Sequence, residues 1–138
     1  MSKEQRQTLV ERGEVAVMFV RTEDDQASIT RAWAELEQAL GSLRGRKFYG
    51  VFDPVSREYR ACVERRVNDE PHALGLELAT VAGGRYARER LHGDPPDVYA
   101  LIAPAFERLS QRTDCDRQRP SVEFYRRRDV IDLLQPVV

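Results

Sequence analysis

The pattern of apolar and polar positions divides the chain into strands and two main helices. Runs of five to nine residues rich in β-branched and aromatic side chains are typical of strands, while apolar residues spaced three and four apart line one side of a helix. The pattern predicts strands at 15–20, 47–53, 58–64, 73–81, 85–91, 121–125 and 130–137, and helices at 28–43 and about 98–109.

Proline, glycine and charged segments mark the boundaries between these elements. Residues 54–57 read as a turn that joins two strands into a hairpin, and Gly83 with Gly84 reads as a bend or bulge. Pro104 must either kink the second helix or make it begin later than the apolar pattern indicates. Residues 1–12 are a polar lead-in, so the domain is expected to span 13–138.

The order strand, helix, strand, strand occurs twice. An offset of 73 residues superimposes apolar positions of the first unit, about 13–66, on those of the second, about 73–138. The matched pairs are Ile29 with Ile102, Trp33 with Phe106, Leu36 with Leu109, Val51 with Phe124, and Phe52 with Tyr125. We therefore predict an α+β fold of duplicated βαββ units with pseudo-two-fold symmetry: an antiparallel sheet, two main helices and a central cleft.

One acidic residue stands in the middle of a predicted strand. Alternation along 121–125 points Ser121, Glu123 and Tyr125 to one face and the apolar residues to the other. At the offset of 73 residues, Gly50 occupies the position of Glu123 in the first unit. A carboxylate beside aromatic rings suits a cationic, partly apolar ligand, because it supplies charge and the rings supply cation–π attraction.

Composition excludes several other classes of protein. The formal net charge is −1 with 33% charged residues, which argues against a dedicated nucleic-acid binder. No apolar run reaches the length of a signal peptide or a membrane span, so a cytoplasmic location and no membrane partner are expected. Two cysteines without a CxxC motif and two distant histidines predict no metal site, no disulfide framework and no cofactor.

Several segments, in this order and spacing, resemble the GyrI-like small-molecule-binding domains, which are also the effector-binding domains of AraC-type and MerR-type transcription regulators. The segments are Tyr49-Gly-Val-Phe-Asp-Pro54, Tyr59-Arg-Ala-Cys-Val63, Gly83-Gly-Arg-Tyr-Ala87 with His92-Gly93, Pro120-Ser-Val-Glu-Phe-Tyr125, and Leu133-Leu-Gln-Pro-Val137. The resemblance runs from about Gly13 to the C-terminus. The residues before the first predicted strand are too few for a helix-turn-helix, so this chain is expected to stand alone and not to bind DNA directly.

The resemblance implies a cleft in which an acid, matching Glu123, faces cationic, often multidrug-like ligands. Tyr125 matches a pocket-lining position, and Phe52 is the nearest counterpart of the aromatics on the first unit's strand. The predicted ligand-binding residues are therefore Glu123, Tyr125, Phe52, Tyr86 and Tyr49. The expected function is binding of an amphipathic, cationic small molecule.

Alternatives remain for these residues. Glu123 could pair with an arginine of a neighbouring strand, and the aromatics could be plain core residues; for Trp33 the core interpretation is preferred. The candidate arginines are Arg60, Arg85, Arg88 and Arg90. Solitary members of the family also include hydrolases of strained compounds, in which Glu123 would act as general base with Tyr125 or Tyr86, and gyrase-interacting proteins. A regulator is a further possible protein partner.

Overall fold

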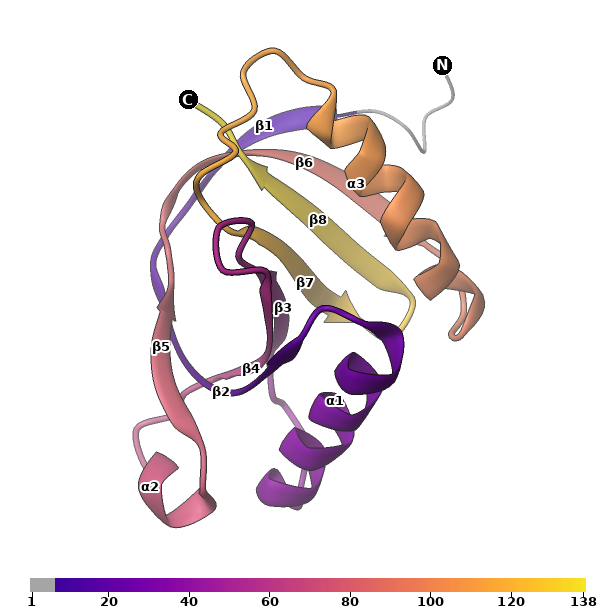
Figure 1. The fold of residues 1–138 in the computed structure, drawn as a ribbon. Helices are drawn as coiled ribbons and strands as arrows, with labels where there is room; N and C mark the ends of the chain where they lie inside the picture. The colour runs from indigo at the N-terminus through magenta and orange to yellow at the C-terminus, as the bar shows by residue number, and fades with distance from the viewer. Residues whose placement is uncertain (1–6) are drawn as a thin grey trace.

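The computed structural model describes residues 7–138, in which an eight-stranded antiparallel sheet carries its helices on one face (Figure 1). The strand order is β1-β6-β8-β7-β3-β4-β2-β5. The strands are β1 Gln7–Arg12, β2 Val15–Glu23, β3 Phe48–Phe52, β4 Glu58–Glu64, β5 Glu77–Val81, β6 Gly84–His92, β7 Ser121–Arg127 and β8 Val130–Pro136. The predicted α+β class with an antiparallel sheet is confirmed.

The centre of the sheet is the pairing of β3 with β7, which joins the first half of the chain to the second. In its register Gly50 lies opposite Glu123, Phe48 opposite Tyr125, and Phe52 opposite Ser121. Four strands lie on each side of this junction. The duplicated pseudo-two-fold relation between the halves remains a prediction.

Helix α1, Gln26–Leu40, packs against β2 and β4 and covers the first half of the sheet. Its first turn is capped by Asp25, whose carboxylate accepts a hydrogen bond from the backbone N–H of Ser28 at 2.8 Å. Because this bond favours the ionised form, the pKa of Asp25 is lowered. The helix ends at Gly41, whose φ of 73° is readily adopted by glycine.

Helix α3, Ile102–Ser110, packs against β6 and β8 and covers the second half. A 3₁₀ helix, η2 Asp97–Leu101, precedes it. The α-helix thus begins later than the apolar pattern indicates, which was one of the two outcomes expected from Pro104. Pro104 lies in the first turn of α3, where a backbone N–H has no partner within the helix.

The alternating strands bury two apolar layers. On the helix-free face, Tyr49, Val122 and Phe124 belong to one cluster that spans both halves of the sheet. On the other face, one cluster lies under α1 and another under α3. Because strand side chains alternate, each central strand contributes to both layers. The β3–β7 junction on the helix-covered face lies between these two clusters.

Two elements differ from the sequence prediction. Residues 7–12, predicted to be part of a polar lead-in, form β1 and pair with β6 in residues 84–89; the rest of that lead-in lies outside the described residues. A strand at the edge of a sheet can be held by backbone hydrogen bonds without apolar side chains. The polar sequence of residues 7–12 therefore gave no strand pattern. Pro71–Leu74 forms a short helix, α2, and the predicted strand at 73–81 therefore begins at Glu77.

Candidate functional site

Glu123 is the third residue of β7, and its side chain lies on the face that carries the helices. Across the junction stands Gly50, and a Cβ built at this glycine would collide with the Glu123 Oε1 and the Tyr59 hydroxyl. The missing side chain therefore provides the space in which the carboxylate and the phenol meet. The φ of Gly50 is not positive, so its backbone conformation does not require glycine. The close approach of the two side chains does.

Two phenols hold one oxygen of the Glu123 carboxylate. Tyr59 and Tyr125 both donate their hydroxyl hydrogen to Oε1, at 2.8 and 2.7 Å. The Trp33 indole N–H in turn donates to the Tyr59 hydroxyl at 3.2 Å. Among residues 7–138 nothing donates to Oε2, and that oxygen keeps contact with solvent. The carboxylate is thus fixed in orientation with one acceptor oxygen open.

Aromatic rings surround this carboxylate. Trp33 of α1 meets Tyr125 edge to face at a centroid distance of 5.5 Å and Phe48 at 6.1 Å. Phe52 lies on the same face, next to Tyr59 across the β3–β4 pair. Except for Tyr59, which is buried, these rings and Glu123 itself remain partly exposed. The site is therefore an apolar surface that solvent reaches, not a sealed core.

The electrostatic environment disfavours ionisation of Glu123. Desolvation by burial raises its pKa, the hydrogen bonds from Tyr125 and Tyr59 lower it, and the charge of Asp24 raises it, with a net rise. The pKa values of both tyrosines are raised well above 10, first by burial and then by the neighbouring carboxylate. The phenols therefore stay protonated and act as donors.

Glu123 has no cationic partner among the residues that the structure describes. In the part of the chain that the structure describes, no Lys, Arg or His lies within 4.0 Å of the Glu123 carboxylate. Two of the candidate arginines bind other acids instead: Arg60 pairs with Glu58 at 2.7 Å, and Arg90 with Asp132 at 2.6 Å. The alternative of an arginine partner for Glu123 is therefore wrong.

The structure brings together three of the five predicted ligand residues. Glu123, Tyr125 and Phe52 share the helix-covered face. Tyr49 and Tyr86 lie on the opposite face, in the cluster with Phe124, so the structure does not bring them beside Glu123. The reason is strand parity: Tyr49 is adjacent to Gly50, so its side chain points away from Glu123.

Three of the aromatic residues around Glu123 were not predicted from the sequence as part of the site. Tyr59 and Phe48 were assigned no role, and Trp33 was interpreted as a core residue. The place of Tyr59 could be predicted only from the register of the strands, because its phenol reaches Gly50 only when β4 pairs with β3 as it does here. Trp33 does pack at helical spacing as predicted, yet it also donates to the Tyr59 hydroxyl and contacts Tyr125. Core packing and a place in the site are compatible for this residue.

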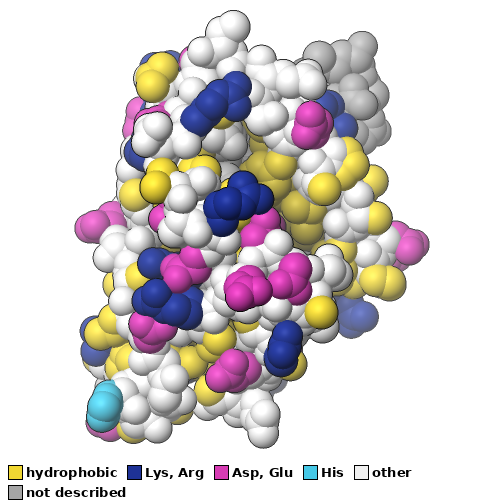
Figure 2. Space-filling model, in the orientation of Figure 1, with side chains coloured by type: hydrophobic (Ala, Val, Ile, Leu, Met, Phe, Trp, Pro, Cys, Tyr) yellow, Lys and Arg dark blue, Asp and Glu magenta, His cyan; other side chains and the backbone are white. Residues whose placement is uncertain are grey.

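Other kinds of site find less support in the described residues. Within 7–138, no group of three or more His, Cys, Asp or Glu side chains could hold a metal ion. None of the described helices has both the length and the apolar character needed to cross a bilayer. On the face shown in Figure 2, acidic and basic side chains are interspersed, so this face offers no extended basic surface of the kind that binds nucleic acid.

Comparison with known proteins identifies the fold. No protein-family model matches the chain, and no curated protein matches it either. Solved structures do match: the integron cassette protein VCH_CASS2 from the mobile metagenome of Vibrio cholerae has a TM-score of 0.78 at 16% identity, covering 96% of this chain and 95% of that one. SAV2435 bound to tetraphenylphosphonium has a TM-score of 0.69 at 10% identity, covering 96% and 94%.

A hydrolase from Listeria innocua has a TM-score of 0.60 at 11% identity, covering 99% of this chain and 94% of that one. These likenesses place the chain in the class of α+β proteins that share this fold over nearly their whole length. At such low identity they show the fold alone. The resemblance to the GyrI-like domains remains a prediction.

Proposed function

We propose that the protein binds a small amphipathic cation at Glu123. The observation that carries this proposal is a carboxylate with one open oxygen, no cationic partner among residues 7–138, and aromatic rings on its flanks. A ligand cation would place its charge by Oε2 and its apolar groups against Trp33, Phe48 and Phe52. Glu123 would be the counter-charge and the rings the walls.

Ionising a partly buried acid that has no cationic partner costs free energy. Because desolvation raises the pKa of Glu123, the ionised form is poorly stabilised in the free protein. A bound cation supplies the missing charge, and aromatic faces add cation–π attraction. The two phenol donors hold Oε1 in place, so little side-chain freedom remains to be lost on binding.

A structural neighbour supports the ligand class. SAV2435, which has the same fold, was solved with tetraphenylphosphonium, a lipophilic cation. Such a molecule combines a single positive charge with aromatic surface, which is the chemistry that the Glu123 site offers. The proposal for this chain is therefore a receptor for cations of this kind, not for one particular compound.

Titration calorimetry with tetraphenylphosphonium tests the proposal. Wild type should bind, and Glu123→Gln should bind at least about tenfold more weakly because it keeps the shape but loses the charge. The matched control is Glu107→Gln, the same change at an exposed position on α3. Neutral triphenylphosphine oxide should bind weakly to all three proteins. Equal affinity of wild type and Glu123→Gln would remove Glu123 from the site.

Hydrolysis of strained or electrophilic small molecules is the second candidate, supported by one feature of the site. The open Oε2 of Glu123 could take a proton from water, and the Tyr125 hydroxyl could stabilise the developing charge once its hydrogen turns from Oε1 to the substrate. The other predicted helper, Tyr86, lies on the opposite face. Turnover of an activated ester that is lost in Glu123→Gln and reduced in Tyr125→Phe would favour this candidate; turnover retained in Glu123→Gln would exclude it.

A further inference from the structure

The turn between β3 and β4 carries an arginine in an unusual backbone conformation. Arg57 has a φ of 62°, and among residues 7–138 it is the one non-glycine residue with a positive φ. The left-handed region favours glycine and asparagine, because the Cβ of most other residues crowds the backbone there. The turn is fixed by Asp53, whose carbonyl accepts a hydrogen bond from the Arg57 backbone N–H at 2.8 Å. The contacts of the Arg57 side chain therefore bear on why arginine stands here.

The Arg57 side chain lies over the ring of Phe52. Its guanidinium carbon is 5.7 Å from the ring centroid, which is within the range of a cation–π contact. Phe52 packs against the cluster under α1 that includes Tyr59, the phenol that donates to Glu123. A positive charge of the protein itself thus lies on one of the aromatic walls of the Glu123 site.

The Arg57 guanidinium has no carboxylate partner in the part of the chain that the structure describes, where every salt bridge within 4.0 Å involves other residues. The residue is also exposed. A cation–π contact at an exposed position is weak, and solvent can hydrate the guanidinium once it leaves the ring. Arg57 can therefore move away from Phe52 at little cost.

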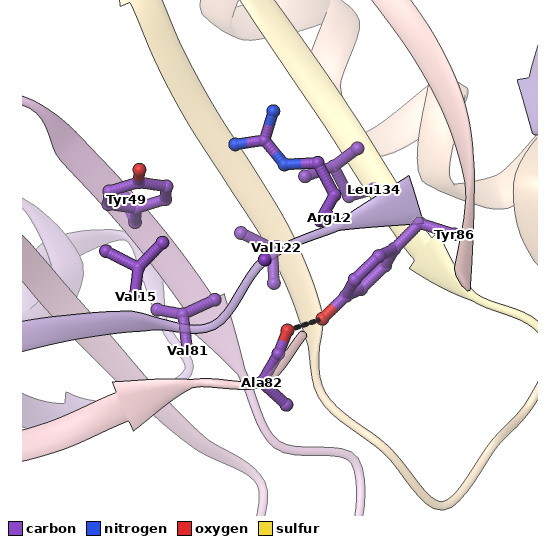
Figure 3. Close-up of a pocket in the computed structure, with 9 residues that line it drawn as sticks. Arg12, Val15, Tyr49, Val81, Ala82, Tyr86, Val122 and Leu134 are labelled. Carbon is purple, nitrogen blue, oxygen red and sulfur yellow. Dashed lines mark hydrogen bonds between the residues drawn. The ribbon is translucent and has the colours of Figure 1, made fainter. Parts of the chain in front are cut away.

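The other stacked arginines lie on the far side of the sheet. Three of them cover the rings of Phe19 and Phe124, which belong to the cluster on the helix-free face, away from Glu123. Figure 3 shows one of these, Arg12, at a hollow of that face; the hollow has room for about one water molecule and is too small for an organic ligand. Among the described residues, Arg57 is thus the stacked arginine on the Glu123 side.

We propose that Arg57 is a built-in competitor of the ligand cation, which covers the Phe52 ring in the free protein and is displaced when the ligand places an aromatic or cationic group there. This inference rests on the proposed function of the Glu123 site. A ligand group and a guanidinium cannot occupy the same ring face, and their like charges repel. Arg57 therefore makes the affinity lower than the open carboxylate and the rings alone would give.

Titration calorimetry with tetraphenylphosphonium tests the inference. Arg57→Asn removes the guanidinium and tolerates a positive φ, so it should bind the cation about two- to fivefold more tightly than wild type, the factor expected from one exposed cation–π contact. The matched control is Arg44→Asn, which removes the same charge from an exposed arginine that covers no ring among the described residues. Its affinity should equal that of wild type.

Nuclear magnetic resonance of wild type gives a second readout that needs no variant. Nuclear Overhauser contacts between the Arg57 side chain and the Phe52 ring should be present in the free protein and lost at saturating tetraphenylphosphonium. Persistence of these contacts at saturation would overturn the inference. So would equal affinity of Arg57→Asn and wild type, or an equal gain in Arg44→Asn, which would indicate an effect of net charge alone.

The Glu123→Gln variant separates this inference from the proposed function. Weaker binding by Glu123→Gln together with unchanged binding by Arg57→Asn would overturn the role of Arg57 and leave the Glu123 site standing. Equal affinity of wild type and Glu123→Gln would instead remove the Glu123 site, and the role of Arg57 with it.

Discussion

At the scale of single residues, the protonation of Glu123 links the site to stability. Because the folded state raises its pKa above that of the unfolded chain, the folded state binds this proton more tightly. The resulting stability is present below the ordinary carboxyl pKa and is lost as the pH rises through the raised one. At neutral pH the ionised acid should therefore weaken the free protein.

Glu123→Gln should remove this dependence, since an amide cannot ionise but its oxygen can still accept from the two phenols. We expect the free energy of unfolding of the variant to exceed that of wild type at neutral pH, with the difference shrinking toward acid pH. Urea unfolding at several pH values measures this, with Glu107→Gln as control. A variant less stable than wild type at neutral pH would contradict the account.

Gly50 offers a second test at this scale. A methyl group there would meet the Tyr59 hydroxyl and the Glu123 carboxylate, so Gly50→Ala should lower the free energy of unfolding by about 1–3 kcal/mol, the usual cost of overpacking, and weaken binding of tetraphenylphosphonium. Gly13→Ala is the matched control, because nothing lies within 4 Å of a Cβ at that position. Equal stability of the two variants in denaturant unfolding would argue against the close approach at Gly50.

At the scale of elements, α3 is tied to the sheet by a buried ion pair. Glu89 of β6 is fully buried and pairs with Arg108 of α3, and the Gln7 side-chain amide of β1 donates to the same carboxylate at 3.3 Å. Removing one partner of such a pair leaves a buried charge uncompensated. The network therefore joins an edge strand, an inner strand and a helix.

Arg108→Met should destabilise the protein by up to about 3 kcal/mol, the lower end of the range for fully buried pairs, because Arg108 is 35% exposed. The double change Glu89→Gln with Arg108→Met should recover part of this loss, since no charge then remains buried. Thermal and denaturant unfolding of the single and double variants measure the effect. A double variant less stable than Arg108→Met would indicate that Glu89 is held by other groups.

The elements also show what sequence patterns can and cannot predict. Apolar runs such as 15–20 and the helical spacing before Gly41 predicted β2 and α1, because burial of one side leaves a visible period. β1 left no such signal, since an edge strand can be held by backbone bonds with polar side chains. The short helix α2 was hidden for a similar reason: four residues are too few to show a helical period.

At the scale of the whole molecule, the candidate site depends on how distant segments meet. Strand alternation alone placed Glu123 and Tyr125 on one face and marked the acid as exceptional. It could not show that Tyr59 reaches the same carboxylate oxygen, because that contact requires the β4–β3–β7 register, nor that Trp33 of α1 closes over it. The register of paired strands and the docking of a helix on a sheet depend on tertiary contacts, which a single sequence predicts only weakly.

A crystal structure of the protein with tetraphenylphosphonium would show whether Glu123 receives the cation. The phosphonium centre is expected to lie beside Glu123 Oε2, with phenyl groups against Trp33, Phe48 or Phe52 and with the Tyr59 and Tyr125 hydrogen bonds to Oε1 retained. A cation bound elsewhere on the molecule, or a Glu123 side chain turned away from the bound cation, would rule out binding at Glu123.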